Sequence, residues 1–279
     1  MNKSSLYKRV TTAFVLIPPV IVGILILPNA VFALLLSMIT MLGAWEWAIL
    51  IGLPRYGYIT LTGIALITTW KLIQNAQALF VLLVVAVVAW GLGLVIVSRY
   101  PTLPSWWRMR LVQAIIGFLI LIPAWASLVA LHGGRFSEMT NGPRYTLFLF
   151  ALVWAADTAA FFAGKRWGSY HLAPQVSPAK TWEGLWGAGV ATLIIAVGGA
   201  WWLDLETRQW IGFIGLCVIT LLSSVLGDLL ESVVKRTQGA KDSGVLLPGH
   251  GGILDRIDSL TAAAPVFVLG WLLLSRLMV

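Results

Sequence analysis

Residues 210–229 read Trp-Ile-Gly-Phe-Ile-Gly-Leu-Cys-Val-Ile-Thr-Leu-Leu-Ser-Ser-Val-Leu-Gly-Asp-Leu, an apolar run with one charged side chain, Asp228, near its end. A helix needs about 20 mostly apolar residues to cross a bilayer, and this run has that length. Of the 279 residues, 59% are hydrophobic and 11% are charged, and the mean hydropathy is +0.90. This composition excludes the soluble globular class, and we predict an all-α, polytopic integral membrane protein.

Apolar runs of this kind fill most of the chain. They predict about nine transmembrane helices, at residues 10–27, 30–51, 58–74, 78–97, 111–131, 145–164, 184–203, 210–229 and 260–278. The third run is short and is interrupted by Lys71 and Gln74. The first run follows basic residues as a secretory signal does, but no small-residue cleavage site follows it and the second run begins at once. We therefore expect a retained first span.

The distribution of Lys and Arg predicts the orientation, because short cytoplasmic loops carry an excess of basic residues. With the N-terminus inside, the cytoplasmic segments hold Lys3, Lys8, Arg9, Arg55, Arg99, Arg108, Arg110, Lys165, Arg166, Lys180, Lys235, Arg236, Lys241 and Arg256. The outer segments hold Lys71, Arg135, Arg144, Arg208 and Arg276. This excess predicts a multi-pass protein of the cell (inner) membrane with a cytoplasmic N-terminus and an external C-terminus.

The predicted spans also divide the chain into two regions. We expect residues 1–140 to form N-terminal transmembrane helices, and residues 141–279 to form a C-terminal region with cytoplasmic loops 165–183 and 230–259. The net charge of +8 is attributed to basic loops that meet anionic headgroups of the lipid bilayer, and no nucleic-acid partner is expected. The single cysteine, Cys217, lies in an apolar run, so we expect neither a disulfide framework nor a thiolate zinc site.

The polar stretch between the eighth and ninth predicted spans concentrates charge that is scarce elsewhere. Asp228 and Glu231 lie three residues apart, with Lys235 four residues further on, and Asp255 and Asp258 repeat the spacing at the start of the ninth span. Residues at these spacings share one face of a helix. The structural alternative is a salt-bridged helix end followed by N-terminal capping carboxylates, although capping needs only one of the two aspartates.

Carboxylate pairs at facing helix ends, joined by a loop rich in glycine and cations, indicate a site for a divalent ion and phosphates. Mg²⁺ prefers carboxylate oxygens and leaves coordination positions to water or phosphate. Glycines let backbone N–H groups approach phosphate oxygens, and cations neutralise a polyphosphate. The glycines are Gly249, Gly251 and Gly252, and the cations are Lys235, Arg236, Lys241 and Arg256.

A second polar loop precedes the seventh predicted span and ends in Ser-Pro-Ala-Lys-Thr-Trp-Glu-Gly at residues 177–184. Ser177, Lys180 and Thr181 are candidates for binding phosphate, because the N–H groups at a helix start are free. The alternative is a basic membrane-flanking loop in which a hydroxyl side chain caps the helix and Glu183 lies in its first turn. The spacing alone does not separate the two interpretations.

Three further ionisable residues are candidates for the site. Asp157 lies inside the sixth predicted span with no cation within a helical turn, and carboxylates in membranes usually face polar cavities. Glu46, between two tryptophans of the second span, either lines the site or has an interfacial structural role. His250 is flanked by glycines and is a candidate ligand or proton carrier. We assign no role to His132 or His171.

The stretch 232–258 resembles the signature of the phosphatidate cytidylyltransferases, also called CDP-diacylglycerol synthases. The matching residues are Ser232, Lys235, Arg236, Lys241, Asp242, Gly244, Pro248, His250, Gly251, Gly252, Asp255, Arg256 and Asp258. Residues 157–164 and 177–184 also resemble the family, although Ala179 stands where the family often has lysine. The first four spans resemble it only in being hydrophobic.

The resemblance implies that region 141–279 is catalytic and transfers the cytidylyl group of CTP to phosphatidate, giving CDP-diacylglycerol and pyrophosphate for phospholipid synthesis. It also implies a requirement for Mg²⁺, a second, monovalent cation, and a homodimer. We expect the metal ligands Asp228, Asp255 and Asp258, and the further catalytic residues Lys241, Asp242, His250 and Arg256. The expected substrate-binding residues are Asp157, Ser177, Lys180, Thr181, Glu183, Lys235, Arg236, Gly251 and Gly252.

Two other functions are alternatives. A related enzyme would use CTP to phosphorylate a polyprenol, and the identity of the lipid product would separate the two. A membrane transporter also places carboxylates and broken helices in the membrane, but its sites usually lie near the midplane and on several spans. Because the charge of this chain clusters at one predicted face, the sequence favours the cytidylyltransferase.

Overall fold

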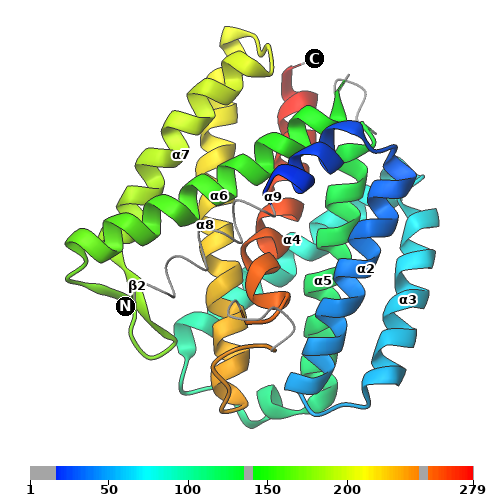
Figure 1. Cartoon of the computed structure of the whole chain (residues 1–279), viewed down its shortest axis with the longest axis vertical. Helices are drawn as coiled ribbons and strands as arrows, with labels where there is room; N and C mark the ends of the chain where they lie inside the picture. The colour runs from blue at the N-terminus through cyan, green and yellow to red at the C-terminus, as the bar shows by residue number, and fades with distance from the viewer. Residues whose placement is uncertain (1–16, 135–140, 245–250, 279) are drawn as a thin grey trace.

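The computed structural model describes residues 17–134, 141–244 and 251–278. Helices make up nearly all of the described structure, with one short hairpin (Figure 1). The elements are the helix Ile17–Ile26, α2 (Asn29–Leu50), α3 (Arg55–Leu72), α4 (Ala76–Arg99), the 3-10 helix η1 (Ser105–Arg108), α5 (Arg110–His132), α6 (Gly142–Trp167), β1 (His171–Ala173), β2 (Ser177–Thr181), α7 (Trp182–Trp202), α8 (Thr207–Thr237) and α9 (Leu254–Met278).

The prediction of an all-α, polytopic membrane protein is confirmed. Among the described helices, seven are long and apolar enough to cross a membrane, namely α2, α4, α5, α6, α7, α8 and α9. The helix Ile17–Ile26 and α3 occupy the first and third predicted spans, but they are not among these seven. The total of nine spans and the cytoplasmic N-terminus therefore stay predictions.

The helix ends near the polar stretch differ from the predicted ones. The eighth helix continues from its apolar part to Thr237, and the ninth begins at Leu254. Both carboxylate pairs therefore lie on regular helix, where three-residue spacing places side chains on one face. The loop before α7 contains an antiparallel hairpin, β1–β2, which pairs His171 with Thr181 and Ala173 with Ser177. The sequence did not predict this hairpin.

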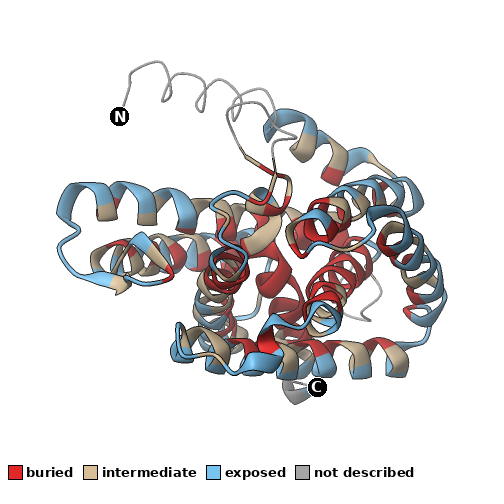
Figure 2. Ribbon diagram, turned by 90° about the horizontal axis from the view of Figure 1, so that it is seen from below, coloured by how far each residue is buried: buried red, intermediate tan, exposed pale blue. Residues whose placement is uncertain are grey.

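The centre of the molecule is formed by α5 and α9. Buried residues make up 78% of the apolar segment of α5 and 61% of that of α9, against 22% for α4. Figure 2 shows the same distribution, with buried positions gathered in the central helices and exposed positions around the edge. Exposed residues of α4 include Val85 and Val88, which is the pattern expected of a helix that faces lipid.

The pair α6–α7 packs through small residues and carries the hairpin at one end. A Cβ at Gly187 would lie 2.4 Å from the Cβ of Ala163, and a Cβ at Gly199 would lie 2.0 Å from the ring of Phe148. Small residues let helix backbones approach closely, which favours helix association in lipid. The two helices lean away from α5 and bring the hairpin to the lower left in Figure 1. Because α7 also contacts α8, the hairpin lies beside the polar end of α8.

Candidate active site

A buried lysine joins carboxylates of α8 and α9. The Nζ atom of Lys235 lies 3.1 Å from Oε2 of Glu231 and 2.6 Å from Oδ1 of Asp255. The three side chains are 10%, 5% and 13% exposed, so water screens these pairs little. The two helices come very close at this level, because a Cβ at Gly227 would lie 2.3 Å from the carbonyl oxygen of Asp258. Glycine at position 227 is therefore what allows the two charged faces to meet.

The hairpin contributes a second, more open ion pair. Lys180, on β2, places its Nζ atom 2.8 Å from Oδ2 of Asp228 and donates a hydrogen bond of 3.4 Å to the carbonyl of Val225. The side chains of Lys180 and Asp228 are 22% and 34% exposed. Asp157 of α6 is exposed beside them and interacts electrostatically with both. This pair is the part of the cluster that a ligand can reach.

Asp258 connects the open pair with the buried one. Its carboxyl group interacts electrostatically with those of Asp228 and Glu231. Its Oδ1 atom also accepts a 2.8 Å hydrogen bond from the N–H of Ser259. Carboxylates that interact in this way repel each other, and positive charge close to them reduces the repulsion. The structure therefore brings five carboxyl groups and two ammonium groups from α6, α8, α9 and the hairpin into one cluster.

The donor chemistry of this cluster fits a divalent cation, although its geometry is not that of a preformed metal site. Among the described residues, no three His, Cys, Asp or Glu side chains are spaced to hold a metal ion. Of the expected ligands, Asp228 and Asp255 each face a lysine instead of one another. Five carboxyl groups nevertheless face two lysines, and carboxylate oxygens are the ligands that Mg²⁺ prefers. The metal assignment of Asp228, Asp255 and Asp258 stays a prediction.

The loop before α9 is folded around Asp255. Its Oδ2 atom accepts hydrogen bonds from the N–H of Gly252 at 2.8 Å and from the N–H and O–H of Ser243 at 3.1 and 2.9 Å. Gly251 adopts a φ of +78°, a conformation in which a side chain is strained. We expected Gly252 to offer its N–H to phosphate, but in this structure that N–H binds Asp255. The contact of Ser243 with Asp255 was not predicted from the sequence. The position of Ser243, a hydroxyl residue directly after Asp242 in a polar loop, could have indicated it.

The hairpin residues confirm part of the structural alternative. The Thr181 hydroxyl accepts a 3.1 Å hydrogen bond from the N–H of Gly184 and caps α7. The Glu183 carboxylate accepts hydrogen bonds from Ser169 and Tyr170, at 3.0 and 3.2 Å, and closes the turn before β1. Both side chains therefore stabilise the hairpin in this structure, and their substrate-binding roles stay predictions. Ser177 is half-buried at the start of β2.

The remaining expected residues lie around the cluster. Arg236, exposed at the end of α8, donates from Nε to the carbonyl of Val176 at 3.3 Å and so ties α8 to the hairpin. Lys241 and Asp242 are exposed after α8, and Arg256 is exposed in the first turn of α9. Gly249 and His250, together with Pro248, lie outside the described residues.

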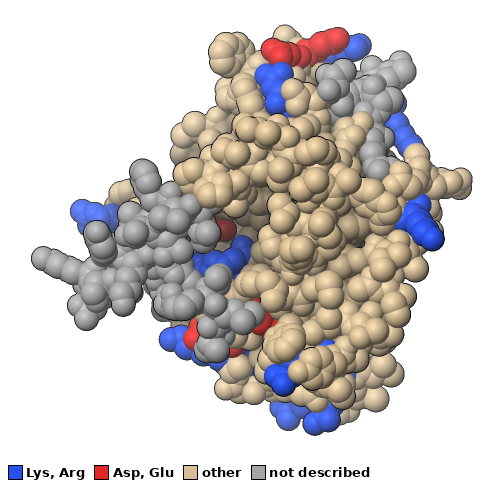
Figure 3. Space-filling model, turned by 45° about the vertical axis from the view of Figure 1, so that its right-hand side comes forward, with Lys and Arg blue, Asp and Glu red and all other residues tan. Residues whose placement is uncertain are grey.

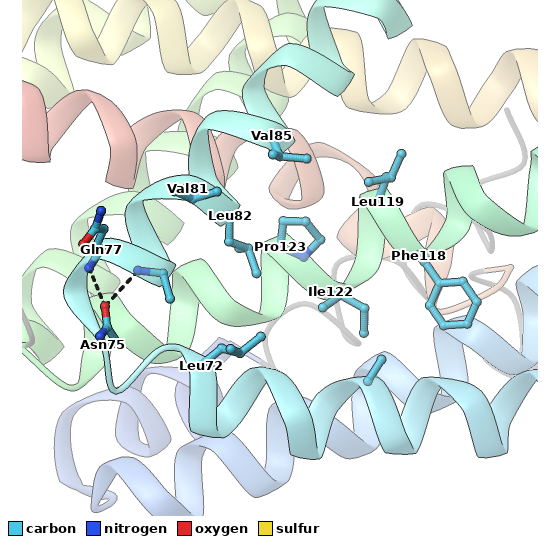
Figure 4. Close-up of a pocket in the computed structure, with 12 residues that line it drawn as sticks. Leu72, Asn75, Gln77, Val81, Leu82, Val85, Phe118, Leu119, Ile122 and Pro123 are labelled. Carbon is cyan, nitrogen blue, oxygen red and sulfur yellow. Dashed lines mark hydrogen bonds between the residues drawn. The ribbon is translucent and has the colours of Figure 1, made fainter.

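The surface at this end combines charge with a hollow. In Figure 3, basic and acidic atoms are visible inside a recess whose surroundings are mainly residues other than Lys, Arg, Asp and Glu. A separate cavity of about 850 Å³ lies elsewhere, between α3, α4 and α5 (Figure 4). Its walls are apolar side chains such as Val81, Val85 and Ile122, and Asn75 at its rim is occupied in capping α4. Because no ionisable side chain lines this cavity, we place the chemistry at the charged cluster.

Comparison with known proteins shows the family of the chain. Residues 7–274 match the model of a family described as the cytidylyltransferase family. A phosphatidate cytidylyltransferase of Pseudomonas aeruginosa is 40% identical over 268 residues, which is 94% of this chain and 95% of the relative. Proteins of the same name from Haemophilus influenzae and Brucella suis are 40% and 36% identical, over 94% and 81% of this chain and 97% and 78% of their own lengths. The chain is thus a member of the cytidylyltransferase family.

Proposed function

We propose that this protein transfers the cytidylyl group of CTP to phosphatidate and releases CDP-diacylglycerol and pyrophosphate. The observation that carries the proposal is the cluster of lysines and carboxyl groups between α6, α8, α9 and the hairpin, at the polar ends of membrane-spanning helices. A lipid phosphate and a nucleotide triphosphate can meet at such a boundary. The names of relatives that match nearly the whole chain support the same reaction.

The reaction joins two anions, which decides what the protein has to supply. An oxygen of the phosphatidate phosphate attacks the α-phosphorus of CTP, and the bond from that phosphorus to the bridging oxygen of the β-phosphate breaks. Pyrophosphate leaves with the bonding electrons. The attacking oxygen is already anionic, so no side chain is needed as a general base. The barrier is mainly repulsion between anions and charge on the leaving group, which positive groups reduce.

The cations of the cluster are therefore assigned to the phosphates. Lys180 is partly exposed and its ammonium group can turn from Asp228 to a substrate phosphate. Arg236, Lys241 and Arg256 are exposed around the cluster and extend its positive charge towards the cytoplasmic side. Lys235 is buried between two carboxylates, so its role is to set the charge of the site.

Magnesium is the cofactor that we propose, held by the carboxylates of Asp228, Asp255 and Asp258. When bound, it supplies positive charge that stabilises the phosphates and the leaving pyrophosphate. A second, monovalent cation is proposed for the same group of carboxyls, on the basis of the resemblance. The excess of carboxyl groups over lysines supports both proposals, since the cluster needs further positive charge.

We further propose that the cluster faces the cytoplasm from the inner membrane. The excess of basic residues in the predicted inner segments supports this orientation. CTP would then enter from the cytoplasm, while the acyl chains of phosphatidate enter sideways from the bilayer. A homodimer follows from the resemblance alone, and chemical cross-linking of the membrane-embedded protein tests it.

Conversion of labelled CTP to a lipid-soluble product, in membranes that contain the full-length protein, tests the function and the metal assignment. Asp228→Asn, Asp255→Asn and Asp258→Asn should each lower the rate on the order of 100-fold, because each removes charge that positions a cation. Asp204→Asn is the matched control, since Asp204 is an exposed carboxylate paired with Arg144 away from the cluster. Near-normal activity in Asp255→Asn and Asp258→Asn would contradict the metal assignment.

The alternatives are separated by the product. A polyprenol kinase would give a phosphorylated polyprenol from CTP, whereas the proposed enzyme gives a liponucleotide from phosphatidate. A transporter would not release pyrophosphate in detergent, where no gradient exists. Formation of CDP-diacylglycerol by the purified protein would exclude both, and none of the comparisons favours either.

A further inference from the structure

Glu46 is a buried carboxylate far in sequence from the charged cluster and close to it in space. It lies on α2 and is 2% exposed. Its Oε2 atom accepts a 2.9 Å hydrogen bond from the N–H of Leu254, the first residue of α9. The hydroxyl of Ser243 lies 3.5 Å from the same oxygen. The carboxylate thus reaches across to the connection between α8 and α9.

A carboxylate at this position satisfies a specific need of α9. The first N–H groups of a helix have no partner within the helix, and a negative charge there is favoured by the helix dipole. Leu254 is buried, so water does not satisfy its N–H. No ion pair between described residues includes Glu46. The start of α9 is therefore the partner of Oε2, while Oε1 is buried with no hydrogen-bond partner among the described residues. The contact with α9 gives a reason for a costly carboxylate in a membrane helix.

The glycines of the loop fit around the same carboxylate. A Cβ at Gly244 would lie 2.4 Å from Oε1 of Glu46, and all three of its closest contacts would be Glu46 atoms. A Cβ at Gly252 would lie 2.5 Å from Oε2 of Glu46 and 2.2 Å from the Ser243 hydroxyl. Two glycines of the signature are thus required by the packing of the loop on Glu46.

Glu46 and Asp255 hold the loop from opposite sides. Ser243 gives its N–H and its hydroxyl to Asp255, and its hydroxyl also lies beside Glu46. The N–H groups of Gly252 and Leu254 bind Asp255 and Glu46 respectively. A displacement of the Glu46 carboxylate would therefore move the backbone that carries Asp255 and Asp258.

We propose that Glu46 is a positioning residue for the cytidylyl transfer site: it fixes the first turn of α9, and with it Asp255 and Asp258, from the N-terminal half of the chain. The inference rests on the proposed roles of Asp255 and Asp258. It assigns a function in the site to α2, although the first four predicted spans lack any part of the signature.

Hydrogen exchange of the purified full-length protein, without added metal, tests the contact itself. In Glu46→Ala, peptides that cover residues 251–260 should exchange about 10-fold faster or more, because a hydrogen bond to a charged acceptor is lost. The control is Thr40→Ala, since Thr40 is a buried polar residue of α2 whose hydroxyl donates to the carbonyl of Leu36 in the same helix. Equal exchange of residues 251–260 in the two variants would overturn the proposal.

The dependence of activity on Mg²⁺ separates positioning from general damage. Glu46→Ala should raise the Mg²⁺ concentration for half-maximal activity about 10-fold, as loss of groups that orient metal ligands does. Glu46→Gln keeps an acceptor for Leu254 and should be affected less. A variant that is merely less stable would lose active protein with an unchanged Mg²⁺ requirement, and that result would also overturn the proposal.

A double substitution tests the glycine contact and guards against misfolding. Gly244→Ala should lower the melting temperature in the wild-type background, because the new methyl group meets Glu46. The same substitution should cost less in Glu46→Ala, where the carboxylate is absent. Equal effects in both backgrounds would refute the contact.

The two proposals fail in different experiments. If Asp255→Asn and Asp258→Asn retain activity, the proposed metal assignment fails. If those two variants lose activity but the Glu46 variants behave like Thr40→Ala, the Glu46 inference alone fails.

Discussion

Replacement of Lys235 by methionine should destabilise the protein as well as inactivate it. The ammonium group lies 2.6 Å from Asp255 and 3.1 Å from Glu231, and the Lys235 side chain is 10% exposed. At an effective dielectric constant of about 20, these distances correspond to attractions of about 6 and about 5 kcal/mol. Desolvation offsets most of this gain, and removing one partner of a buried pair typically costs about 3–5 kcal/mol, since the remaining charge is left uncompensated.

The expected loss in Lys235→Met is therefore about 3–5 kcal/mol, or on the order of 10 °C in melting temperature. Lys180→Met is the matched comparison, because Lys180 also binds an aspartate, at 2.8 Å, but this pair is 22% and 34% exposed. Exposed pairs contribute about 1 kcal/mol or less, so Lys180→Met should melt within about 2–3 °C of the wild type. Both variants should lose activity.

Thermal unfolding of the full-length protein in detergent, followed by tryptophan fluorescence, measures the difference. The chain contains 15 tryptophans, which makes this signal strong. If Lys235→Met has the same melting temperature as the wild type, the ammonium group does not neutralise the buried carboxylates and the reasoning is refuted. Equal losses of stability in the two variants would refute the distinction drawn from burial.

Three further predictions test the fold, the hairpin and the orientation. Gly187→Ala should destabilise the α6–α7 pair by about 1–3 kcal/mol. Gly189→Ala should not, because the space beside Gly189 on the same helix is open. Equal melting temperatures of the two variants would contradict the packing. Thr181→Ala should cost about 1 kcal/mol through loss of the α7 cap and Thr181→Ser much less, so equal losses would exclude capping. A membrane-impermeant thiol reagent should label Lys241→Cys in inverted vesicles and Asp204→Cys in intact cells, and the reverse pattern would overturn the orientation.

The local part of the site was predictable from sequence. Asp228 with Glu231, and Asp255 with Asp258, were placed on helix faces because three-residue spacing has this meaning wherever a helix continues. The structure extends α8 to Thr237 and starts α9 at Leu254, so the condition is met. The apolar runs likewise predicted the helices, since a chain in lipid must satisfy its backbone hydrogen bonds within each segment.

The long-range part was not predictable. Lys180 binds Asp228 only because the hairpin folds back beside α8. The sequence of the hairpin lacks the alternation of apolar and polar residues that predicts a strand. Thr181 kept two interpretations because a hydroxyl at a helix start is suited both to capping and to phosphate. Glu46 lies 208 residues before its partner Leu254, so no spacing relates the two.

The glycines of the signature follow from these long-range contacts rather than from phosphate binding alone. Gly252 gives its N–H to Asp255 and turns its α-carbon to Glu46 and Ser243. Because this N–H already bonds Asp255, our proposal assigns the phosphates at this end to side-chain cations such as Lys241. At Gly244, the three atoms nearest to an added methyl group all belong to Glu46. Positions 244 and 252 are therefore glycine because the Glu46 carboxylate, joined at position 252 by the Ser243 hydroxyl, occupies the space that side chains would fill.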